Sequence, residues 1–144
     1  MVKDIIKERR TEKSEAGWTL MELIVVLVIL GMLAAVVGPK IYDSLAKGKD
    51  QITRMQLSEF ESALQIYVFD TGRFPSTAEG LQALVQNPTG SDSWKGPYLR
   101  KSVPMDPWER PYVYKSPGSH GDYDLYSFGA DGVEGNDDDI CSWK

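Results

Sequence analysis

One uninterrupted apolar run near the start of the chain limits the possible folds more than any other feature. From Trp18 to Gly38 it reads WTLMELIVVLVILGMLAAVVG, and Glu22 is its only charged residue. As a helix these residues would extend for about 31 Å, close to the thickness of the hydrocarbon core of a bilayer. The run is apolar on every side, whereas a helix in a soluble domain normally keeps one polar face. We therefore predict a membrane-spanning helix at residues 18–38.

The segment in front of this run, residues 1–17, is rich in charge and has no regular apolar spacing. An ordinary secretory signal ends its shorter apolar stretch at a small-x-small cleavage site, and the only candidate here, Val36-Val37-Gly38, is weak. A simple signal anchor fits the length but explains neither Gly17 nor Glu22. The remaining class of segment carries its processing site before the apolar run, which indicates cleavage after Gly17.

Glu22 is unusual because a carboxylate at the centre of a membrane helix costs about 3 kcal/mol and is often functional. One interpretation is that Glu22 lies near the headgroups and is solvated there. The other is that cleavage after Gly17 frees the α-amino group of Trp18, which lies one helical turn away. That cation could pair with Glu22 of the same subunit or of a neighbouring one.

The composition excludes several classes of function. The net charge of −5 argues against a nucleic-acid partner, because phosphate binding needs a basic surface. The chain has a single cysteine, Cys141, and a single histidine, His120, so it cannot form an internal disulfide. The same scarcity leaves little material for a catalytic triad or a multi-histidine metal site, and we predict that the chain is not an enzyme. His120 stands in a loop-like context and is predicted to be an exposed structural residue.

Beyond the apolar run the sequence predicts that the helix continues. Pro39 should kink or locally melt it. Apolar residues then recur at spacings near three and four as far as Asp70, and Thr71-Gly72 should end the helix. These residues are Ile41, Leu45, Ile52, Met55, Leu57, Phe60, Leu64, Tyr67 and Val68. Their stripe is expected to pack against the rest of a single domain of roughly 100 residues.

The remainder of the chain is rich in proline and glycine and predicts short elements. Ser76 and Glu79 form a candidate capping box before a short helix at residues 81–85. Residues 112–114 and 122–128 are predicted strands of a small antiparallel sheet laid on the long helix. The predicted fold class is therefore α+β.

The N-terminal pattern resembles a known processing signal. Gly17-Trp18-Thr19-Leu20-Met21-Glu22 followed by LIVVLVILGMLAAVVGP resembles the cleavage-and-methylation signature of type IV pilins and type II secretion pseudopilins. The resemblance implies that a prepilin peptidase cuts after Gly17 and methylates the new N-terminus at Trp18, and that Glu22 contributes to subunit assembly. Trp18 departs from the phenylalanine usual at the first mature position.

The rest of the chain is similar to the major pseudopilins of the type II secretion system. The resemblance rests on the motifs GRFPST, EGLQAL, GPYL, DPW and DYDLYSFGADG, which lie between Gly72 and Gly132. Glu109 departs from the family, which usually has glycine after this tryptophan, and the acidic loop at residues 132–140 is shorter. A type IV pilin of a surface fibre is an alternative, although the chain lacks the cysteine pair that closes a C-terminal loop in such pilins.

The acidic loop could bind calcium, which prefers carboxylate and carbonyl oxygens on flexible loops. The residues alone leave open whether this loop holds calcium or is a solvated acidic turn. The resemblance implies one structural calcium ion, with Asp131 as the firmest side-chain ligand and the Phe128 carbonyl as the matching backbone ligand. The further candidate ligands are Val133, Asp137, Asp138 and Asp139.

These expectations combine into one prediction of organisation and role. Residues 1–17 form a cleaved leader, residues 18–38 the membrane and filament-core helix, and residues 39–144 the periplasmic domain with its helix continuation. The resemblance implies a single-pass inner-membrane protein that polymerises into a periplasmic pseudopilus, with minor pseudopilins and the inner-membrane secretion platform as partners. A signal-anchored periplasmic enzyme or calcium-binding protein is a rival hypothesis, but no convergent set of catalytic groups supports it.

Overall fold

The computed structural model describes residues 18–144, and the predicted leader with its cleavage position at Gly17 lies outside them. The described chain begins with the helix α1 (Leu20–Thr71) and continues with the 3₁₀ helix η1 (Leu81–Leu84). Three short strands follow, β1 (Val113–Lys115), β2 (Asp124–Ser127) and β3 (Ile140–Cys141). The chain divides after Lys40 into two units, which we describe separately.

The first unit contains the apolar beginning of α1. Nearly all of its side chains are exposed, on every side of the helix. By length and composition α1 is able to cross a membrane. The helix also continues through Pro39 without a break, so the predicted local melting at this residue is wrong. A proline removes only one hydrogen bond, and intact turns on both sides keep the helix together; the predicted kink stays a prediction.

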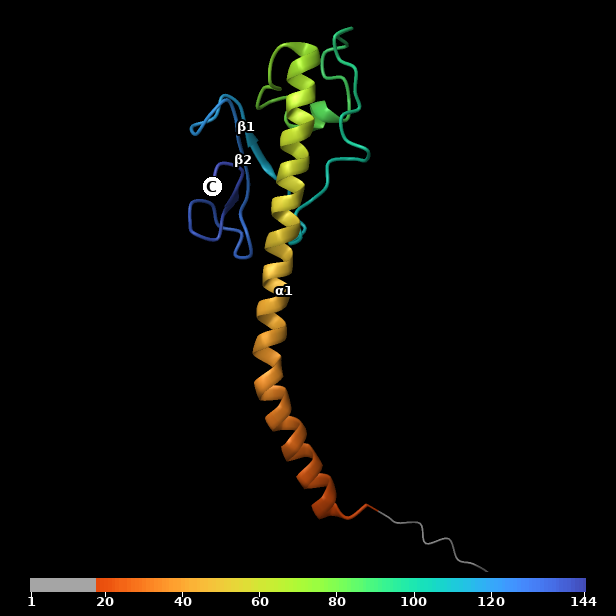
Figure 1. The fold of residues 1–144 in the computed structure, drawn as a ribbon, viewed down its shortest axis with the longest axis vertical. Helices are drawn as coiled ribbons and strands as arrows, with labels where there is room; N and C mark the ends of the chain where they lie inside the picture. The colour runs from red at the N-terminus through yellow and green to blue at the C-terminus, as the bar shows by residue number, and fades with distance from the viewer. Residues whose placement is uncertain (1–17) are drawn as a thin grey trace, which may run out of the picture. The chain divides into compact units, whose positions relative to one another are not determined.

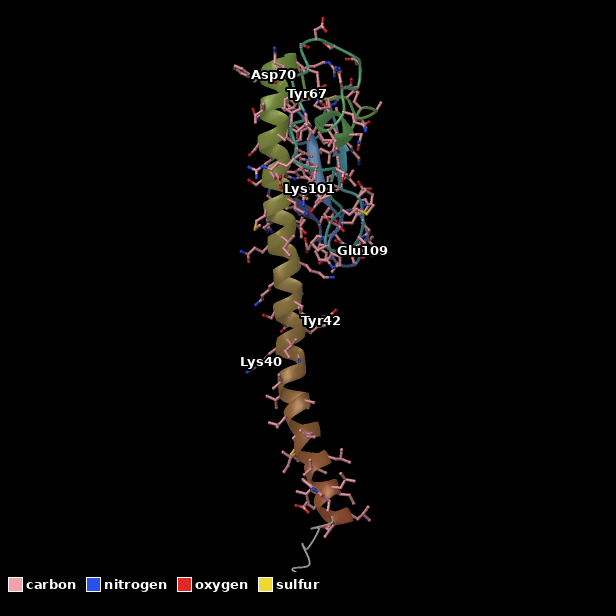
Figure 2. All side chains as sticks on the ribbon, turned by 90° about the vertical axis from the view of Figure 1, so that its right-hand side faces the viewer. Lys40, Tyr42, Tyr67, Asp70, Lys101 and Glu109 are labelled. Atoms are coloured by element: carbon pink, nitrogen blue, oxygen red, sulfur yellow. The ribbon has the colours of Figure 1, made fainter. Side chains whose placement is uncertain are left out.

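The second unit, residues 41–144, is built on the remaining part of α1. Leu57, Phe60, Leu64 and Tyr67 recur at helical spacing and are at most 3% exposed, so they form the buried face of this half of the helix. In Figure 2 Tyr67 points toward the packed loops, whereas Tyr42 projects from a stretch of helix with no loop beside it. The helix ends at Thr71, within one residue of the predicted position, and Gly72 follows in the left-handed conformation with φ of 79°.

A small sheet packs beside this half of α1, as Figure 1 shows. The order is β1-β2-β3 and both pairs are antiparallel, with Tyr114 opposite Leu125 and Ser127 opposite Ile140. Leu125 is fully buried and joins Leu84, Leu99 and Ile140 in the same core. The α+β fold class and the first two strands are therefore confirmed, while β3 was not predicted because two residues are too few to show alternation.

Candidate functional site

Glu22, the predicted assembly residue, lies in the first turn of α1, and Trp18, the predicted new N-terminus, lies two residues before the helix. The backbone N–H of Glu22 donates to Thr19 Oγ1 at 3.1 Å, which makes Thr19 the N-cap and places the Glu22 carboxylate in the first turn, where the helix dipole favours it. Trp18 is 70% exposed, Glu22 is also exposed, and no ion pair of Glu22 occurs among the residues from 18 onward. The carboxylate is therefore free to meet a charge from outside its own helix.

The acidic loop in its full extent is the connection between β2 and β3, residues 128–139, and it contains the residues predicted to bind calcium. The backbone N–H of Asp131 donates to Asp138 Oδ2 at 2.9 Å, and Asp131 Oδ1 accepts from the N–H of Val133 at 2.9 Å. Asn136 joins the two aspartates, since its Nδ2 donates to Asp131 Oδ2 at 2.6 Å and its Oδ1 accepts from the N–H of Asp138 at 2.9 Å. The structure thus brings Asp131 and Asp138 together through shared hydrogen bonds.

Gly129 allows this close approach. Its φ is 64°, and a Cβ added there would overlap the backbone carbonyl and the carboxylate of Asp138. Glycine is therefore required both by conformation and by space. The turn after Phe128 lies directly against Asp138 as a result, so that backbone carbonyls and a carboxylate share one small region.

The other two aspartates of the loop are placed differently. Asp139 Oδ2 accepts from the N–H of Gly135 at 2.7 Å, whereas Asp139 Oδ1 is buried and has no hydrogen-bond partner in the described chain. Asp139 also lines a cavity of about 240 Å³ together with His120 and Cys141. Asp137 is exposed, and its side chain makes no hydrogen bond or ion pair with the residues that the structure describes. The predicted ligands therefore do not all converge.

The donor atoms of this loop still fit calcium. They are hard oxygens, and the buried, unpartnered Oδ1 of Asp139 is an acceptor that needs a cation or a donor. Within residues 18–144 no group of three or more His, Cys, Asp or Glu side chains is arranged to hold a metal ion by itself. A calcium ion here would consequently need backbone carbonyls as well, and Phe128 and Val133 could enter only through theirs.

A second set of contacts attaches the acidic loop to the sheet. Glu134 Oε1 accepts from Lys115 Nζ at 3.0 Å and from the hydroxyl of Tyr126. The hydrogen bond from Tyr126, followed by that from Lys115, holds the pKa of the Glu134 carboxyl below its ordinary value. Because Lys115 is on β1 and Tyr126 on β2, this carboxylate connects the loop to both strands. Sequence analysis missed Glu134 and Asn136, although both stand inside the acidic block.

The histidine lies in the loop between β1 and β2. The His120 ring stacks on Trp143 with centroids 4.1 Å apart, and its Nδ1 lies 3.1 Å from Asp124 Oδ1. Burial raises the pKa of the Asp124 carboxyl, but the N–H groups of Ser119 and His120 together with the imidazole outweigh it, so the pKa is below the ordinary value. These contacts hold the C-terminal segment on the sheet, and the predicted structural role of His120 agrees with them.

A buried carboxylate fixes the turn that precedes β1. Asp106 is 4% exposed, and its Oδ1 accepts from the N–H groups of Trp108 and Arg110 at 3.0 and 2.8 Å. Its Oδ2 accepts from Ser127 Oγ at 2.6 Å, at the end of β2. The Arg110 side chain crosses to the acidic loop, where Nη2 donates to the carbonyl of Gly129. Sequence analysis did not single out Arg110, because nothing in its local sequence points to a partner so far along the chain.

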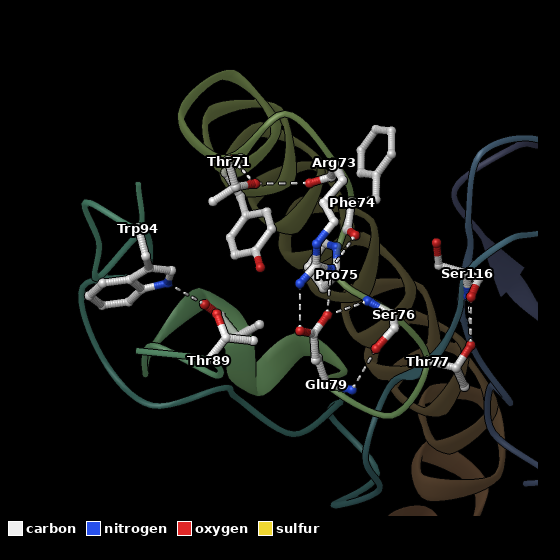
Figure 3. Close-up of polar contacts among 12 residues, drawn as sticks. Thr71, Arg73, Phe74, Pro75, Ser76, Thr77, Glu79, Thr89, Trp94 and Ser116 are labelled. Carbon is white, nitrogen blue, oxygen red and sulfur yellow. Dashed lines mark hydrogen bonds and ion pairs between the residues drawn. The ribbon is translucent and has the colours of Figure 1, made fainter. Parts of the chain in front are cut away.

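Residues 73–79 form a corner directly after α1, and their side chains make another polar cluster (Figure 3). Glu79 Oε2 accepts from the N–H of Ser76 at 2.7 Å, and Ser76 Oγ accepts from the N–H of Glu79 at 3.3 Å, so the reciprocal hydrogen bonds of the predicted capping box form. They close the turn at residues 77–80, however, and do not cap η1, whose N-cap is Gly80. Arg73 adds a two-pronged ion pair of 2.7 Å to each Glu79 oxygen. The hydrogen bond from Arg73 is the main reason that the pKa of Glu79 falls to about 2.

Known proteins share this fold and these motifs. The family described as "Type II secretion system (T2SS), protein G" matches residues 40–143. Relatives named "Type II secretion system core protein G" are 44% identical in Pseudomonas aeruginosa, over 91% of this chain and 96% of the relative, and 40% identical in Escherichia coli K12, over 94% of each.

A solved structure supports the same assignment. The crystal structure of the major pseudopilin from the type 2 secretion system of enterohaemorrhagic Escherichia coli superposes with a TM-score of 0.61 and 37% identity. The match covers 70% of this chain and 87% of that one. The chain therefore belongs to the type II secretion system protein G family, and it is a structural pseudopilin subunit of that secretion system.

Proposed function

We propose that the chain is made as a precursor, is cut after Gly17 by a prepilin peptidase that methylates Trp18, and polymerises with further copies into a periplasmic pseudopilus. The observation that carries this proposal is the first unit, an apolar helix exposed on every side that holds one carboxylate, Glu22. Such a surface is stable in lipid or when covered by other apolar helices. Growth of the filament would drive protein export across the outer membrane.

Glu22 has a specific part in this assembly. Its carboxylate stands in the first turn of α1 with no ion pair in the described chain, one turn from the N-terminus that cleavage after Gly17 would create. In a low dielectric an ammonium group and a carboxylate attract each other far more strongly than in water. The terminal amine of Trp18 in a neighbouring subunit would therefore pair with Glu22 and set the axial position of each new copy.

The proposed setting follows from the same segment. The helix would anchor the subunit in the inner membrane by a single pass, with residues 39–144 in the periplasm. The relatives are named as core proteins of a secretion system, which supports minor pseudopilins and the inner-membrane platform as partners. On this proposal the chain is not an enzyme, since the peptidase performs the chemistry at Gly17.

Two measurements test the proposal on the full chain in cells that contain the peptidase. Intact mass and N-terminal sequencing should give a mature chain that begins at methylated Trp18; an uncut leader or a start near Pro39 would contradict it. Cross-linking of overproduced subunits should give a ladder of oligomers that Glu22→Ala reduces strongly without preventing cleavage. Glu22→Asp keeps the charge and should retain part of the ladder, whereas an unchanged ladder in the alanine variant would mean that Glu22 is only solvated.

We further propose that the loop at residues 128–139 holds one structural calcium ion. The Asp131 and Asp138 carboxylates would be its side-chain ligands, since the Asp131 N–H donates to the Asp138 carboxylate and Asn136 bonds the Asp131 carboxylate and the Asp138 backbone. The unpartnered oxygen of Asp139 would contribute to its charge balance. When bound, calcium would cross-link the turn after β2 to the segment that enters β3. Because the chain has no disulfide, such a link would stabilise a small domain outside the cytoplasm.

Calorimetric titration tests this site. The purified chain should bind one calcium ion, and Asp131→Ala should abolish binding. Asp137→Ala is the matched control, because Asp137 stands in the same acidic run but is exposed and makes no side-chain hydrogen bond or ion pair in the described structure. Equal binding by the wild type and the Asp131 variant would remove the calcium assignment.

A further inference from the structure

Arg110 brings a positive charge into the acidic loop. Its Nη2 donates to the carbonyl of Gly129, and its Nη1 lies against Gly132, where an added Cβ would overlap it. Gly129 and Gly132 both have positive φ, 64° and 73°. The turn is therefore held between the guanidinium of Arg110 on one side and Asp138 on the other.

The position of this guanidinium is fixed at its base. The N–H of Arg110 donates to Asp106 Oδ1 at 2.8 Å, and the Arg110 carbonyl accepts from the N–H of Asp106 at 2.8 Å. The other Asp106 oxygen accepts from Ser127 Oγ, just before the turn. One buried carboxylate thus links the start of the Arg110 side chain to the start of the acidic loop, so the guanidinium reaches the turn with little freedom.

The charge of Arg110 has no ion-pair partner among residues 18–144. No carboxylate forms a salt bridge with Arg110 within the described part of the chain, and its Nε is buried without a hydrogen-bond partner. The only hydrogen bond of the guanidinium in that part of the chain goes to a carbonyl of the acidic loop, which also carries Asp131, Asp138 and Asp139. A positive charge at this place lowers the repulsion among the three carboxylates and repels a second cation.

We propose that Arg110 is a built-in cation that partly replaces calcium in ordering the acidic loop, so that this subunit keeps the loop folded at low calcium and binds the ion more weakly than it would without Arg110. The inference rests on the calcium site proposed above. Arg110 is a positioning residue: it acts on the turn and on the local charge, and it does not ligate the ion.

The test compares the full chain with Arg110→Met and Arg110→Lys in detergent, by calcium titration and by thermal melting in chelator. Arg110→Met should melt at a lower temperature in chelator, because the turn loses its hydrogen bond and the carboxylates lose their counter-charge. It should bind calcium about tenfold more tightly at low salt, since two cations no longer repel, and the difference should shrink at high salt. Arg110→Lys keeps the charge and should keep calcium affinity near the wild-type value.

The control is Arg100→Met, an exposed arginine in a different loop that makes no contact with the acidic loop in the described structure, and it should change neither quantity. If Arg110→Met lowers the melting temperature but leaves calcium affinity unchanged, Arg110 is only a structural residue and the inference is overturned. Weaker calcium binding by Arg110→Met would overturn it as well. If no variant, including the wild type, binds calcium, the calcium proposal fails first and the inference fails with it.

Discussion

Two polar clusters on this subunit, the corner at residues 73–79 and the acidic loop, differ in how their carboxylates are neutralised. In the corner at residues 73–79, the Glu79 carboxylate receives Arg73 and the backbone of Ser76, so one acid meets one base inside the fold. In the loop at residues 131–139, five acidic side chains share one lysine, one arginine placed on a carbonyl, and backbone N–H groups. The corner is balanced by the chain itself, whereas the loop keeps an excess of negative charge.

This difference in charge balance predicts whether calcium or pH changes the stability of each cluster. A carboxylate with its own arginine is indifferent to divalent cations but sensitive to acid, because protonation removes the pair. A loop with surplus carboxylates gains stability from any cation that fits it. We therefore expect the loop to respond to calcium at neutral pH and the corner to respond to pH at constant calcium.

Calcium removal should have the largest effect. Binding to the folded state alone adds about 2.7 kcal/mol when the free ion is 100-fold above its Kd. For a domain of about 100 residues this corresponds to a rise in melting temperature on the order of 10 °C. Thermal melting of the full chain in detergent, followed by near-ultraviolet circular dichroism with calcium or with chelator, measures this change in melting temperature. Magnesium should do much less, because it requires a tighter octahedron and holds its waters.

The corner provides the control for this experiment. Glu79→Gln should keep the full calcium response, since its carboxylate is far along the chain from the loop and already paired. Asp131→Ala should lose the response. If the melting curves with calcium, magnesium and chelator all overlay for the wild type, the loop is a solvated acidic turn, and the predicted difference in calcium response between the loop and the corner is wrong.

Breaking the corner should have the next largest effect. Glu79→Gln removes the ion pair with Arg73, and at neutral pH we expect a loss of about 1 kcal/mol, kept small because the Arg73 side chain is half exposed and screened. For a domain of this size the melting temperature should fall by about 4–8 °C.

The pH dependence gives the sign of this contribution. The pKa of Glu79 is lowered from 4.5 to about 2, so the stabilising charge is fully present above pH 4.5 and is lost as the pH falls through 2. The gap between the wild type and Glu79→Gln should therefore close in acid. A gap that stays constant between pH 7 and pH 2 would mean that the carboxylate charge contributes nothing.

A smaller effect is expected when one hydrogen bond between the acidic loop and the sheet is removed. Tyr126→Phe removes the hydroxyl that donates to Glu134, and we expect a smaller loss of stability than in Glu79→Gln, with weaker calcium binding, because the loop loses one of its attachments. The matched control is Tyr123→Phe, whose hydroxyl makes no hydrogen bond to any described residue, and it should be neutral. If both variants lower stability equally, the bond to Glu134 has no special role.

Local patterns predicted much of this fold. The helical spacing from Leu57 to Tyr67 gave the buried face, Thr71-Gly72 gave the end of the helix, and Ser76 with Glu79 gave the capping box. Each of these depends on residues no more than a few turns apart. The interactions that produce these features therefore all lie within a short stretch of the sequence.

The rest depends on contacts between distant segments. Arg110 reaches Gly129, Lys115 reaches Glu134, and β3 is recognisable only by its pairing with β2. Resemblance identified the acidic loop, but the residues alone did not distinguish Asp138, whose carboxylate bonds Asp131, from Asp137, whose side chain makes no hydrogen bond with the described residues. Adjacent aspartates look identical in a sequence, and only the path of the backbone gives them different neighbours.

The smallest effect should come from Glu109, in the turn that carries Arg110 to the loop. Glu109 has a φ of 62°, a left-handed conformation that is strained for a residue with a Cβ. Glu109→Gly should relieve this strain and stabilise the domain by about 0.5–1 kcal/mol, despite the greater freedom of glycine in the unfolded chain. Glu109→Ala removes the charge but keeps the Cβ, so it should give no gain in thermal melting. Equal stabilisation by both variants would assign the effect to the charge of Glu109, and a loss with glycine would mean that the turn needs the stiffness of an ordinary residue to position Arg110.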